Sequence, residues 1–516
     1  MSQLGFWSLA REYPDALALV DVDGRAIRAG ELLAASNRLV HGLRTLGLRH
    51  GDVVATVLPN GAPMVELTLA AAQAGWYVVP INHHLTAPEI AYIVGDSGAR
   101  AFVAHERFAD ACRGAATQLG FPAEARFAIG NVPGFQPYTQ LSAGQPDTTP
   151  PDRAAGAVMN YTSGTTGRPK GVRRPLPPLD PDTLATLFTG FLAMFGIQPR
   201  AENVHLVGSP LYHTAVLVFA SSSIHYGHTL VLMDRWTPED ALALIQRHRV
   251  TTSHMVPTQL HRLLALPPDV RSRYDVSSLR HMVHAAAPCP VDVKRRILEW
   301  WGPVLYEYYA ATEGGGTLVR PEEWLAHPGT VGRAWPGSAI RILDDEGKEC
   351  PPGTPGTVYM KLGAANFEYH KDREKTEKSR RGEFFTVGDV GYLDPEGWLY
   401  LCDRKSDMII SGGVNIYPAE IESVLLTHPK VADAAVFGVP NADWGEEVKA
   451  VIEPAPGAEP GPALAADLLD FCRDKLAKYK TPRTVDFLAS LPRDPNGKLY
   501  KRKLRDPYWQ GRERAI

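Results

Sequence analysis

The sequence has few cysteines and no paired cysteine motif. Five of its 516 residues are cysteine, an odd number, and they lie far apart at Cys112, Cys289, Cys350, Cys402 and Cys472. Because no C-x-x-C pair occurs, neither a zinc site nor a framework of disulfide bonds is indicated. Scattered cysteines of this kind are typical of a reducing compartment, so we expect a cytoplasmic protein.

A strong charge of one sign and long apolar runs are also missing. The formal net charge is −3, which gives no indication of a nucleic-acid partner. No apolar stretch reaches the ~20 residues that cross a bilayer, and the first residues do not resemble a secretory signal. We therefore expect no transmembrane segment, while peripheral membrane contact stays open. The sequence does not decide between a monomer and a homodimer.

The length indicates more than one domain, since a single core rarely grows to 516 residues. The N-terminal part alternates helical patterns, at 32–46 and 64–74, with apolar runs at 52–58 and 77–81, and the pattern returns at about 204–310. Such alternation is typical of an α/β fold with a largely parallel sheet.

The character of the sequence changes towards the C-terminus. Residues 340–402 contain short strands and turns such as 394–397 (DPEG), which predict a β-rich subdomain. After the charged cluster at 402–407, enough chain remains for a small α+β module. We therefore expect a large N-terminal domain, 1–403, and a small C-terminal domain, 404–516. The small domain is expected to have helices at 419–427 and 463–478 and strands at 434–439 and 448–453.

The segment Tyr161–Gly171 (YTSGTTGRPKG) carries the strongest chemical signal. Its glycines let backbone N–H groups converge on an anion, its hydroxyls add donors, and Lys170 adds positive charge. The spacing differs from the G-x-x-x-x-G-K-[ST] pattern, which disfavours a P-loop NTPase. A flexible linker would not need this order of residues. We predict a polyphosphate cradle formed by Thr162, Ser163, Gly164, Thr165, Thr166, Gly167 and Lys170.

This segment resembles the phosphate-binding loop of the adenylate-forming superfamily, which includes acyl-CoA synthetases, adenylation domains of peptide synthetases and firefly-type luciferases. Four further segments match in the same order, so the resemblance covers nearly the whole chain. It implies an AMP-forming acid–thiol ligase that uses ATP and Mg²⁺ to activate a carboxylic acid as acyl-AMP. The acyl group would then pass to coenzyme A.

Two of the matching segments concern the nucleotide. In Tyr308–Gly314 the resemblance implies that Tyr309 stacks on adenine, Thr312 contacts the α-phosphate and Glu313 helps to hold Mg²⁺. In Phe385–Tyr392 it implies that Asp389 accepts the ribose hydroxyls, as suits a carboxylate. Judged alone, Tyr309 could be a core aromatic residue, Glu313 a surface carboxylate and Asp389 a turn residue. Their occurrence together favours a nucleotide site.

A shorter match concerns the strand end at 284–288 (HAAAP), which the resemblance places beside adenine through Ala285 and Ala286. Alanine stands there, and at Ala310, where the family more often has glycine.

The two remaining matches lie near the C-terminus. Within 403–415 the resemblance implies that Arg404 lies near the ribose and phosphate, and that the interdomain hinge falls at Ser406. Gly412 and Gly413 match a loop beside the pantetheine tunnel, and an ordinary Gly-Gly turn is an equally open alternative. The catalytic lysine of the family matches Lys498, which would bridge the substrate carboxylate and an ATP phosphate while the small domain rotates between half-reactions.

The acid and the acceptor are less closely defined. His213 matches a motif before the acyl-pocket helix and is interpreted as a gate, with a structural role equally open. Small residues on the pocket-side segments predict a medium-to-long fatty acid or a bulky sterol-like or aryl acid. The absence of an insertion within 403–422 favours CoA. The alternatives are an adenylating enzyme with another acceptor and a catalytically silent regulator that binds acyl groups or nucleotides.

Overall fold

The computed structural model describes residues 4–162, 169–200, 202–311, 313–362, 367–493 and 499–510. The chain divides into two compact units, which are described separately. Unit 1 consists of Met1–Met255, Pro268–Val283 and Ala365–Lys378, and unit 2 of Val256–Pro267, His284–Ala364 and Ser379–Ile516.

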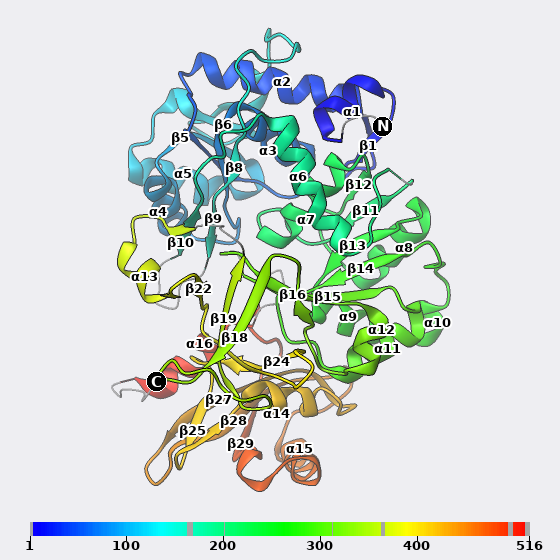
Figure 1. Ribbon diagram of the computed structural model, residues 1–516, viewed down its shortest axis with the longest axis vertical. Helices are drawn as coiled ribbons and strands as arrows, with labels where there is room; N and C mark the ends of the chain where they lie inside the picture. The colour runs from blue at the N-terminus through cyan, green and yellow to red at the C-terminus, as the bar shows by residue number, and fades with distance from the viewer. Residues whose placement is uncertain are drawn as a thin grey trace. The chain divides into compact units, whose positions relative to one another are not determined.

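Unit 1 contains a six-stranded, entirely parallel sheet in the order β7-β6-β5-β3-β4-β8. Figure 1 labels β5, β6 and β8 of this sheet. The parallel arrangement predicted from the alternating pattern is confirmed, because the expected strands at 52–58 and 77–81 form β3 and β4 side by side. The strands are β3 (Val53–Val57), β4 (Tyr77–Pro80), β5 (Ala99–His105), β6 (Arg126–Ile129), β7 (Gln136–Pro137) and β8 (Ala157–Val158).

Helices cover both faces of this sheet. Val53, Ala55 and Val57 of β3 pack in one apolar cluster with α4 (Ala87–Ser97) and α5 (Ala109–Leu119). The intervening Val54 belongs to a second cluster with α2 (Ala29–Thr45) and α3 (Ala62–Ala74). Because alternate residues of a strand point to opposite faces and both faces are covered, β3 is buried along its whole length.

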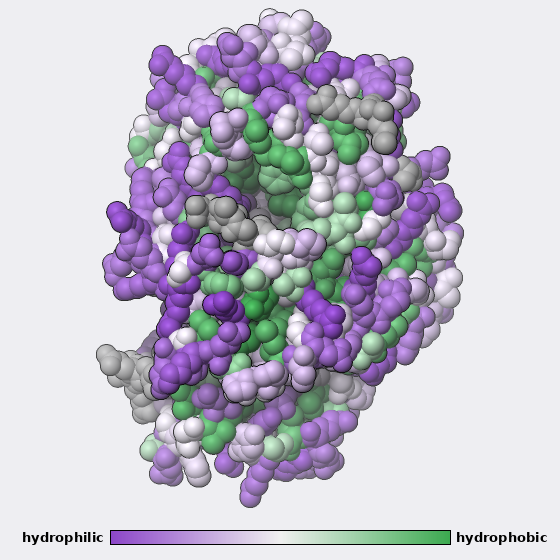
Figure 2. Space-filling view, in the orientation of Figure 1, coloured by the Kyte–Doolittle hydropathy of each residue, from purple (hydrophilic) through white to green (hydrophobic). Residues whose placement is uncertain are grey.

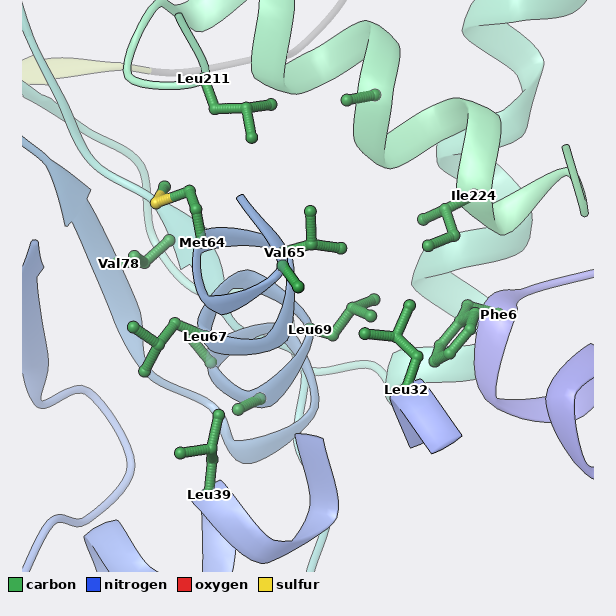
Figure 3. Close-up of a cluster of buried hydrophobic side chains, with 14 of the residues drawn as sticks. Phe6, Leu32, Leu39, Met64, Val65, Leu67, Leu69, Val78, Leu211 and Ile224 are labelled. Atoms are coloured by element: carbon green, nitrogen blue, oxygen red, sulfur yellow. The ribbon is translucent and has the colours of Figure 1, made fainter. Parts of the chain in front are cut away.

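Helix α3 is apolar on nearly every side. Met64 and Leu67 lie near Val78 of β4, whereas Val65 and Leu69 point towards Ile224 (Figure 3). A helix with no polar face is typical of a core position. It ends at Gly75, whose φ of 72° provides the left-handed conformation of a helix C-cap.

The second sheet of unit 1 has the order β14-β13-β11-β12-β1-β2, and β2 is antiparallel to β1. A small antiparallel sheet joins β20, β10 and β9. These strands are β1 (Leu17–Val20), β2 (Ala26–Arg28), β9 (Asn160–Thr162), β10 (Lys170–Arg173), β11 (Val204–Val207), β12 (Thr229–Leu232), β13 (Thr252–Met255), β14 (His281–His284) and β20 (Glu368–Tyr369). The other helices are α1 (Phe6–Glu12), α6 (Pro181–Met194), α7 (Thr214–His225), α8 (Pro238–His248), α10 (Pro268–Arg271) and α13 (Arg373–Lys378).

Helix α6 leaves apolar side chains uncovered. Leu187 and Phe188 are 64% and 52% exposed, and Figure 2 shows hydrophobic side chains gathered over this helix. Its opposite side, through Ala185, belongs to the main core cluster of unit 1.

Unit 2 is built largely from antiparallel strands. The first group, β15 to β17, forms an antiparallel set. A six-stranded sheet has the order β21-β22-β19-β23-β24, with β18 beside β19, and occupies the region predicted to be β-rich. The strands are β15 (Leu305–Ala310), β16 (Gly316–Val319), β17 (Arg333–Ala334), β18 (Ser338–Leu343), β19 (Gly356–Leu362), β21 (Arg380–Arg381), β22 (Phe384–Phe385), β23 (Asp389–Leu393) and β24 (Leu399–Arg404). The helices here are α9 (Pro257–Leu264), α11 (Val291–Trp301) and α12 (Pro321–Ala326).

The C-terminal residues of unit 2 form a mixed sheet with helices packed against it. Strands β27 (Val431–Asn441) and β28 (Gly445–Pro454) make one long hairpin, because their backbone pairing continues past the apolar residues that predicted shorter strands. The remaining elements are β25 (Ile409–Ser411), β26 (Val414–Ile416), α14 (Pro418–Leu425), α15 (Pro462–Lys475), β29 (Thr484–Phe487) and α16 (Lys501–Arg505). Across the described ranges, no helix combines the length and apolar character needed to span a membrane.

Candidate functional site

The predicted site residues fall in both units, and each group is described within its own unit. Unit 1 contains Thr162, Lys170 and His213. Unit 2 contains Ala285, Ala286, Tyr309, Glu313, Asp389, Arg404, Gly412 and Gly413. The predicted residues Ser163, Gly164, Thr165, Thr166, Gly167, Thr312 and Lys498 lie outside the described residues, as does the side chain of Thr162.

Three predicted nucleotide residues of unit 2 lie together. Asp389, at the start of β23, is directly opposite Arg404, at the end of β24, and the guanidinium Nε lies 3.6 Å from the carboxylate Oδ1. The hydroxyl of Tyr309 donates a hydrogen bond of 2.6 Å to Oδ2 of the same carboxylate. Burial and the nearby Asp389 raise the pKa of the Tyr309 phenol well above its usual value, so the hydroxyl stays protonated and remains a donor. This arrangement offers an aromatic ring, a diol acceptor and a cation in one place.

The hairpin between Asp389 and Arg404 accounts for their pairing. Its turn is the predicted Asp394–Gly397 segment, in which Oδ1 of Asp394 accepts the backbone N–H groups of Glu396 and Trp398. Gly397 has a φ of 83°, a conformation that glycine adopts without steric cost. Two residues 15 positions apart in sequence, Asp389 and Arg404, are therefore fixed opposite one another by local structure.

Glu313 follows β15 and is 7% exposed. Among the described residues, no cluster of three or more His, Cys, Asp or Glu side chains that would hold a metal ion is found. Mg²⁺ in nucleotide enzymes usually takes one or two carboxylates and completes its shell with phosphates and water. Glu313, a buried carboxylate in the turn that follows β15, fits that donor set.

Ala286 has a left-handed backbone, with a φ of 74°. This conformation costs a non-glycine residue about 1–2 kcal/mol because its Cβ crowds the following carbonyl. The strain occurs where the family more often has glycine, immediately beyond the end of β14. The alanine segment thus keeps a backbone shape suited to glycine.

A buried ion pair, which sequence reasoning missed, lies next to this segment. Nζ of Lys294, on α11, is 2.5 Å from Oε2 of Glu307, on β15, and Nε2 of His284 is 3.5 Å from the same oxygen. Lys294 is fully buried and lies 4.8 Å from the centre of the Trp324 ring. Burial raises the pKa of Glu307, while Lys294 acts in the opposite direction. The pair ties α11 to β15, the strand that carries Tyr309.

In unit 1, Lys170 is the first residue of β10 and pairs through its backbone with Thr162 of β9. Its Nζ is 2.5 Å from Oδ2 of Asp372, which lies just beyond β20. This partner was also missed, because 202 positions separate the two residues in sequence.

His213 is the N-cap residue of α7, and its ring lies 4.4 Å from that of Tyr212. Tyr212 in turn meets His83 edge-on at 5.0 Å. The position at a helix N-terminus, where partial positive charge gathers, suits an anion such as a carboxylate. It suits a structural aromatic cluster equally well.

Gly412 and Gly413 form the two-residue turn of the β25–β26 hairpin, with φ values of 58° and 78°. A Cβ on Gly412 would lie 2.6 Å from the Trp444 ring, so the position requires glycine. The geometry is that of an ordinary hairpin turn. The hinge residue predicted at Ser406 offers its carbonyl to Nη1 of Arg505, 3.0 Å away on α16.

Comparisons with known proteins agree with these motifs. Residues 6–368 match the family model described as AMP-binding enzyme, and residues 420–498 match the AMP-binding enzyme C-terminal domain. The chain is 33% identical to the fatty acid–[acyl-carrier-protein] ligase ScoC of Streptomyces coeruleorubidus, covering 96% of this chain and 94% of that protein. It is 34% identical to a feruloyl-CoA synthase of an Amycolatopsis species, covering 97% and 98%. The solved structure of the amide bond synthetase McbA from Marinactinospora thermotolerans matches with a TM-score of 0.82, 28% identity and coverage of 98% and 99%.

The chain therefore belongs to the AMP-binding enzyme family, within the adenylate-forming superfamily that its motifs resemble, and is an enzyme of the acid–thiol ligase class. The relatives differ in acid and in acceptor, so membership of the family leaves both to be argued.

Proposed function

We propose that this protein is an AMP-forming acyl-CoA ligase. The observation that supports it most directly is the contact of Tyr309, Asp389 and Arg404, which combines an aromatic ring, an acceptor for vicinal hydroxyls and a cation. These are the groups that an adenosine monophosphate moiety needs for its base, its ribose and its phosphate.

The proposed chemistry has two steps. An oxygen of the substrate carboxylate attacks the α-phosphorus of ATP, which forms a C–O–P anhydride and releases pyrophosphate. The thiol of CoA then attacks the acyl carbon, loses its proton and displaces AMP. The first step replaces a poor leaving group on the acid by a good one.

Charge on the polyphosphate is the main obstacle to the first step. Lys170 would bind the departing pyrophosphate, and Lys498 would orient the carboxylate for in-line attack. Glu313 would hold Mg²⁺ together with phosphate oxygens, and the ion would supply charge neutralisation there. Arg404 would keep the AMP part in place through both steps.

CoA is the proposed acceptor for two reasons. The chain passes from β24, which ends at Arg404, to β25, which begins at Ile409, through a short turn and without an inserted segment. The hairpin turn at Gly412 and Gly413 would then allow the pantetheine arm a close approach. A carrier-protein thiol and an amine, the acceptors implied by the names of two relatives, are the competing acceptors.

We propose a medium-to-long fatty acid or a bulky sterol-like or aryl acid as the substrate. The small residues of the pocket-side segments, including Ala215, Ser222 and Ser223 on α7, favour this proposal because they would leave space for a large acyl group. The relatives act on both kinds of acid, according to their names: a fatty acid and ferulate.

We also propose that residues 404–516 act as a mobile domain that turns about Ser406. Two apolar clusters consist entirely of residues between Ile409 and Leu504, so this part of the chain has a core of its own. A separate core is what a domain needs in order to move as a body.

Exchange of labelled pyrophosphate into ATP tests the adenylation step alone. Exchange that depends on both an acid and Mg²⁺, and that is lost in Lys498→Ala, is the expected result. A silent nucleotide-binding regulator would give no exchange with any acid.

A further inference from the structure

The ammonium of Lys170 and the carboxylate of Asp372 form a close ion pair in unit 1. Their Nζ and Oδ2 atoms are 2.5 Å apart, and the two side chains are 23% and 21% exposed. The pair is thus partly shielded from water and joins the predicted polyphosphate cradle to a segment that no motif identifies.

The backbone around Asp372 fixes its position with respect to Lys170. Strand β20 pairs with β10, and the N–H of His370 donates to the carbonyl of Gly171 at 2.7 Å. Lys371 then adopts a left-handed conformation, with a φ of 55°, and turns the chain back. Such a conformation is strained for a lysine, so the turn has to be maintained by the contacts around it.

Further hydrogen bonds hold the two ends of this turn. The backbone carbonyl of Asp372 accepts the hydroxyl of Thr376 at 2.9 Å, and that hydroxyl also accepts the N–H of Tyr369 at 3.0 Å. On the other side, the carbonyl of Asp96 accepts Nζ of Lys371 at 2.6 Å and lies 3.0 Å from Nε2 of His370. The backbone that carries the Asp372 carboxylate is therefore held by contacts within unit 1.

Three groups near Lys170, namely Asp372, Tyr92 and Asp96, favour its protonated form. The hydrogen bond that Lys170 donates to Asp372 is the largest cause of its raised pKa, burial acts in the opposite direction, and the charges of Asp372, Tyr92 and Asp96 add smaller favourable effects. The last two belong to α4, and Asp96 is itself hydrogen-bonded by the hydroxyl of Tyr161 at 2.7 Å. Lys170 is thus a full cation at neutral pH.

We propose that Asp372 is a positioning residue that holds Lys170 ready to bind the polyphosphate of ATP. The inference rests on the proposed function, since that function assigns Lys170 to the polyphosphate. A free lysine side chain loses rotamer entropy when it is fixed. Asp372 fixes it beforehand and uses one of three ammonium donors, so phosphate oxygens can take the others.

A competing role for Asp372 is physically reasonable, and it predicts the opposite change in the affinity for ATP. If Asp372 acted as a competing anion that keeps Lys170 from the phosphates, its removal would strengthen ATP binding. The direction of the change in KM for ATP therefore decides between the two roles.

The test compares three variants of the full chain. Asp372→Asn removes the charge, Asp372→Glu keeps it, and Glu374→Gln removes a carboxylate two positions away that pairs with Lys378 at 2.6 Å on the exposed side of α13. Asp372→Asn should raise KM for ATP about tenfold with little change in kcat, because the cost of ordering Lys170 then falls on ATP binding. Asp372→Glu should recover most of the loss, and Glu374→Gln should behave like the wild type.

A second readout does not depend on the acid substrate. Lys170 is labelled with an amine-reactive anhydride and followed by mass spectrometry, with and without ATP. Loss of the Asp372 charge should speed labelling, because more of the amine is then neutral, and ATP should protect Lys170 in the wild type. An unchanged or lowered KM for ATP in Asp372→Asn, or unchanged labelling, overturns the inference even if acyl-CoA is formed normally. If no acid supports adenylation, the proposed function fails, and the labelling still reports on the pair.

Discussion

The hydroxyl of Tyr309 donates a hydrogen bond to the carboxylate of Asp389, although 80 positions separate them in sequence. The two residues belong to β15 and β23, and the second carboxylate oxygen faces Arg404. Asp389 is 9% exposed, so these partners replace the water that a carboxylate would otherwise bind. The contact fixes a diol acceptor beside an aromatic ring before nucleotide binds.

Asp389→Asn should remove the ability of the enzyme to distinguish ATP from 2′-deoxy-ATP. A carboxylate that accepts a hydroxyl contributes about 1.5–3 kcal/mol, so the wild type should show a KM for 2′-deoxy-ATP at least about tenfold higher than for ATP. In the variant this ratio should fall towards one, while KM for ATP itself rises. Glu396→Gln, at the exposed turn of the same hairpin, is the matched control. An unchanged ratio in Asp389→Asn would remove Asp389 from the ribose.

Ala286→Gly should stabilise the protein. Glycine relieves the left-handed strain at a φ of 74° but loses more conformational entropy on folding, so the net gain should be about 0.5–1 kcal/mol. The adjacent Ala285 has no left-handed strain to relieve. Ala285→Gly should therefore lower the free energy of unfolding by about as much as Ala286→Gly raises it. Urea denaturation measures both free energies of unfolding. A loss of stability in both variants would show that the left-handed residue is unstrained.

Lys294→Met should be strongly destabilising, by about 3–5 kcal/mol, because it leaves the Glu307 charge buried without its partner. The double variant Lys294→Met/Glu307→Leu replaces the pair by apolar groups of similar size and should recover most of that loss. Denaturant titration of the three proteins tests this. If the double variant were no more stable than the single one, the pair would have a role beyond mutual neutralisation.

Acid should destabilise the fold below pH 6.5. Burial lowers the pKa of His225 to about 4, so between these values the unfolded chain binds a proton that the folded chain does not. Stability therefore falls as pH drops from about 6.5 to about 4, by about 1.4 kcal/mol per unit for this group. Burial also lowers the pKa values of His205, His228, His254 and His281 into the range of about 3 to 4.

His225→Asn isolates one contribution to that pH dependence. The asparagine Oδ1 can replace Nδ1, which accepts the N–H of Phe6 at 3.1 Å, but cannot be protonated. The slope of the unfolding free energy against pH gives the number of protons taken up on unfolding. This number should fall by about one between pH 4 and 6.5. An identical slope would show that another group takes up the proton.

The sequence predicted the fold where structure is local. Alternating patterns predicted the parallel strands β3 and β4, and the predicted turn at Asp394–Gly397 is present, although the pairing of Asp389 with Arg404 across its hairpin was not predicted. The same reasoning could not find Asp372 as the partner of Lys170, since only the pairing of β10 with β20 brings them together. It also missed Lys294, because a lysine on a helix is normally solvated and only the packed structure shows it buried beside Glu307.

The most direct test of the account is mass spectrometry of the products formed from ATP, Mg²⁺, CoA and a panel of acids from acetate to long-chain, aryl and ring-bearing acids. The account predicts acyl-CoA, AMP and pyrophosphate with the larger acids, and none of them in Lys498→Ala. Acyl-AMP without a thioester would keep the adenylation and remove CoA as the acceptor. Release of ADP and phosphate, or no product from any acid, would contradict the central claim.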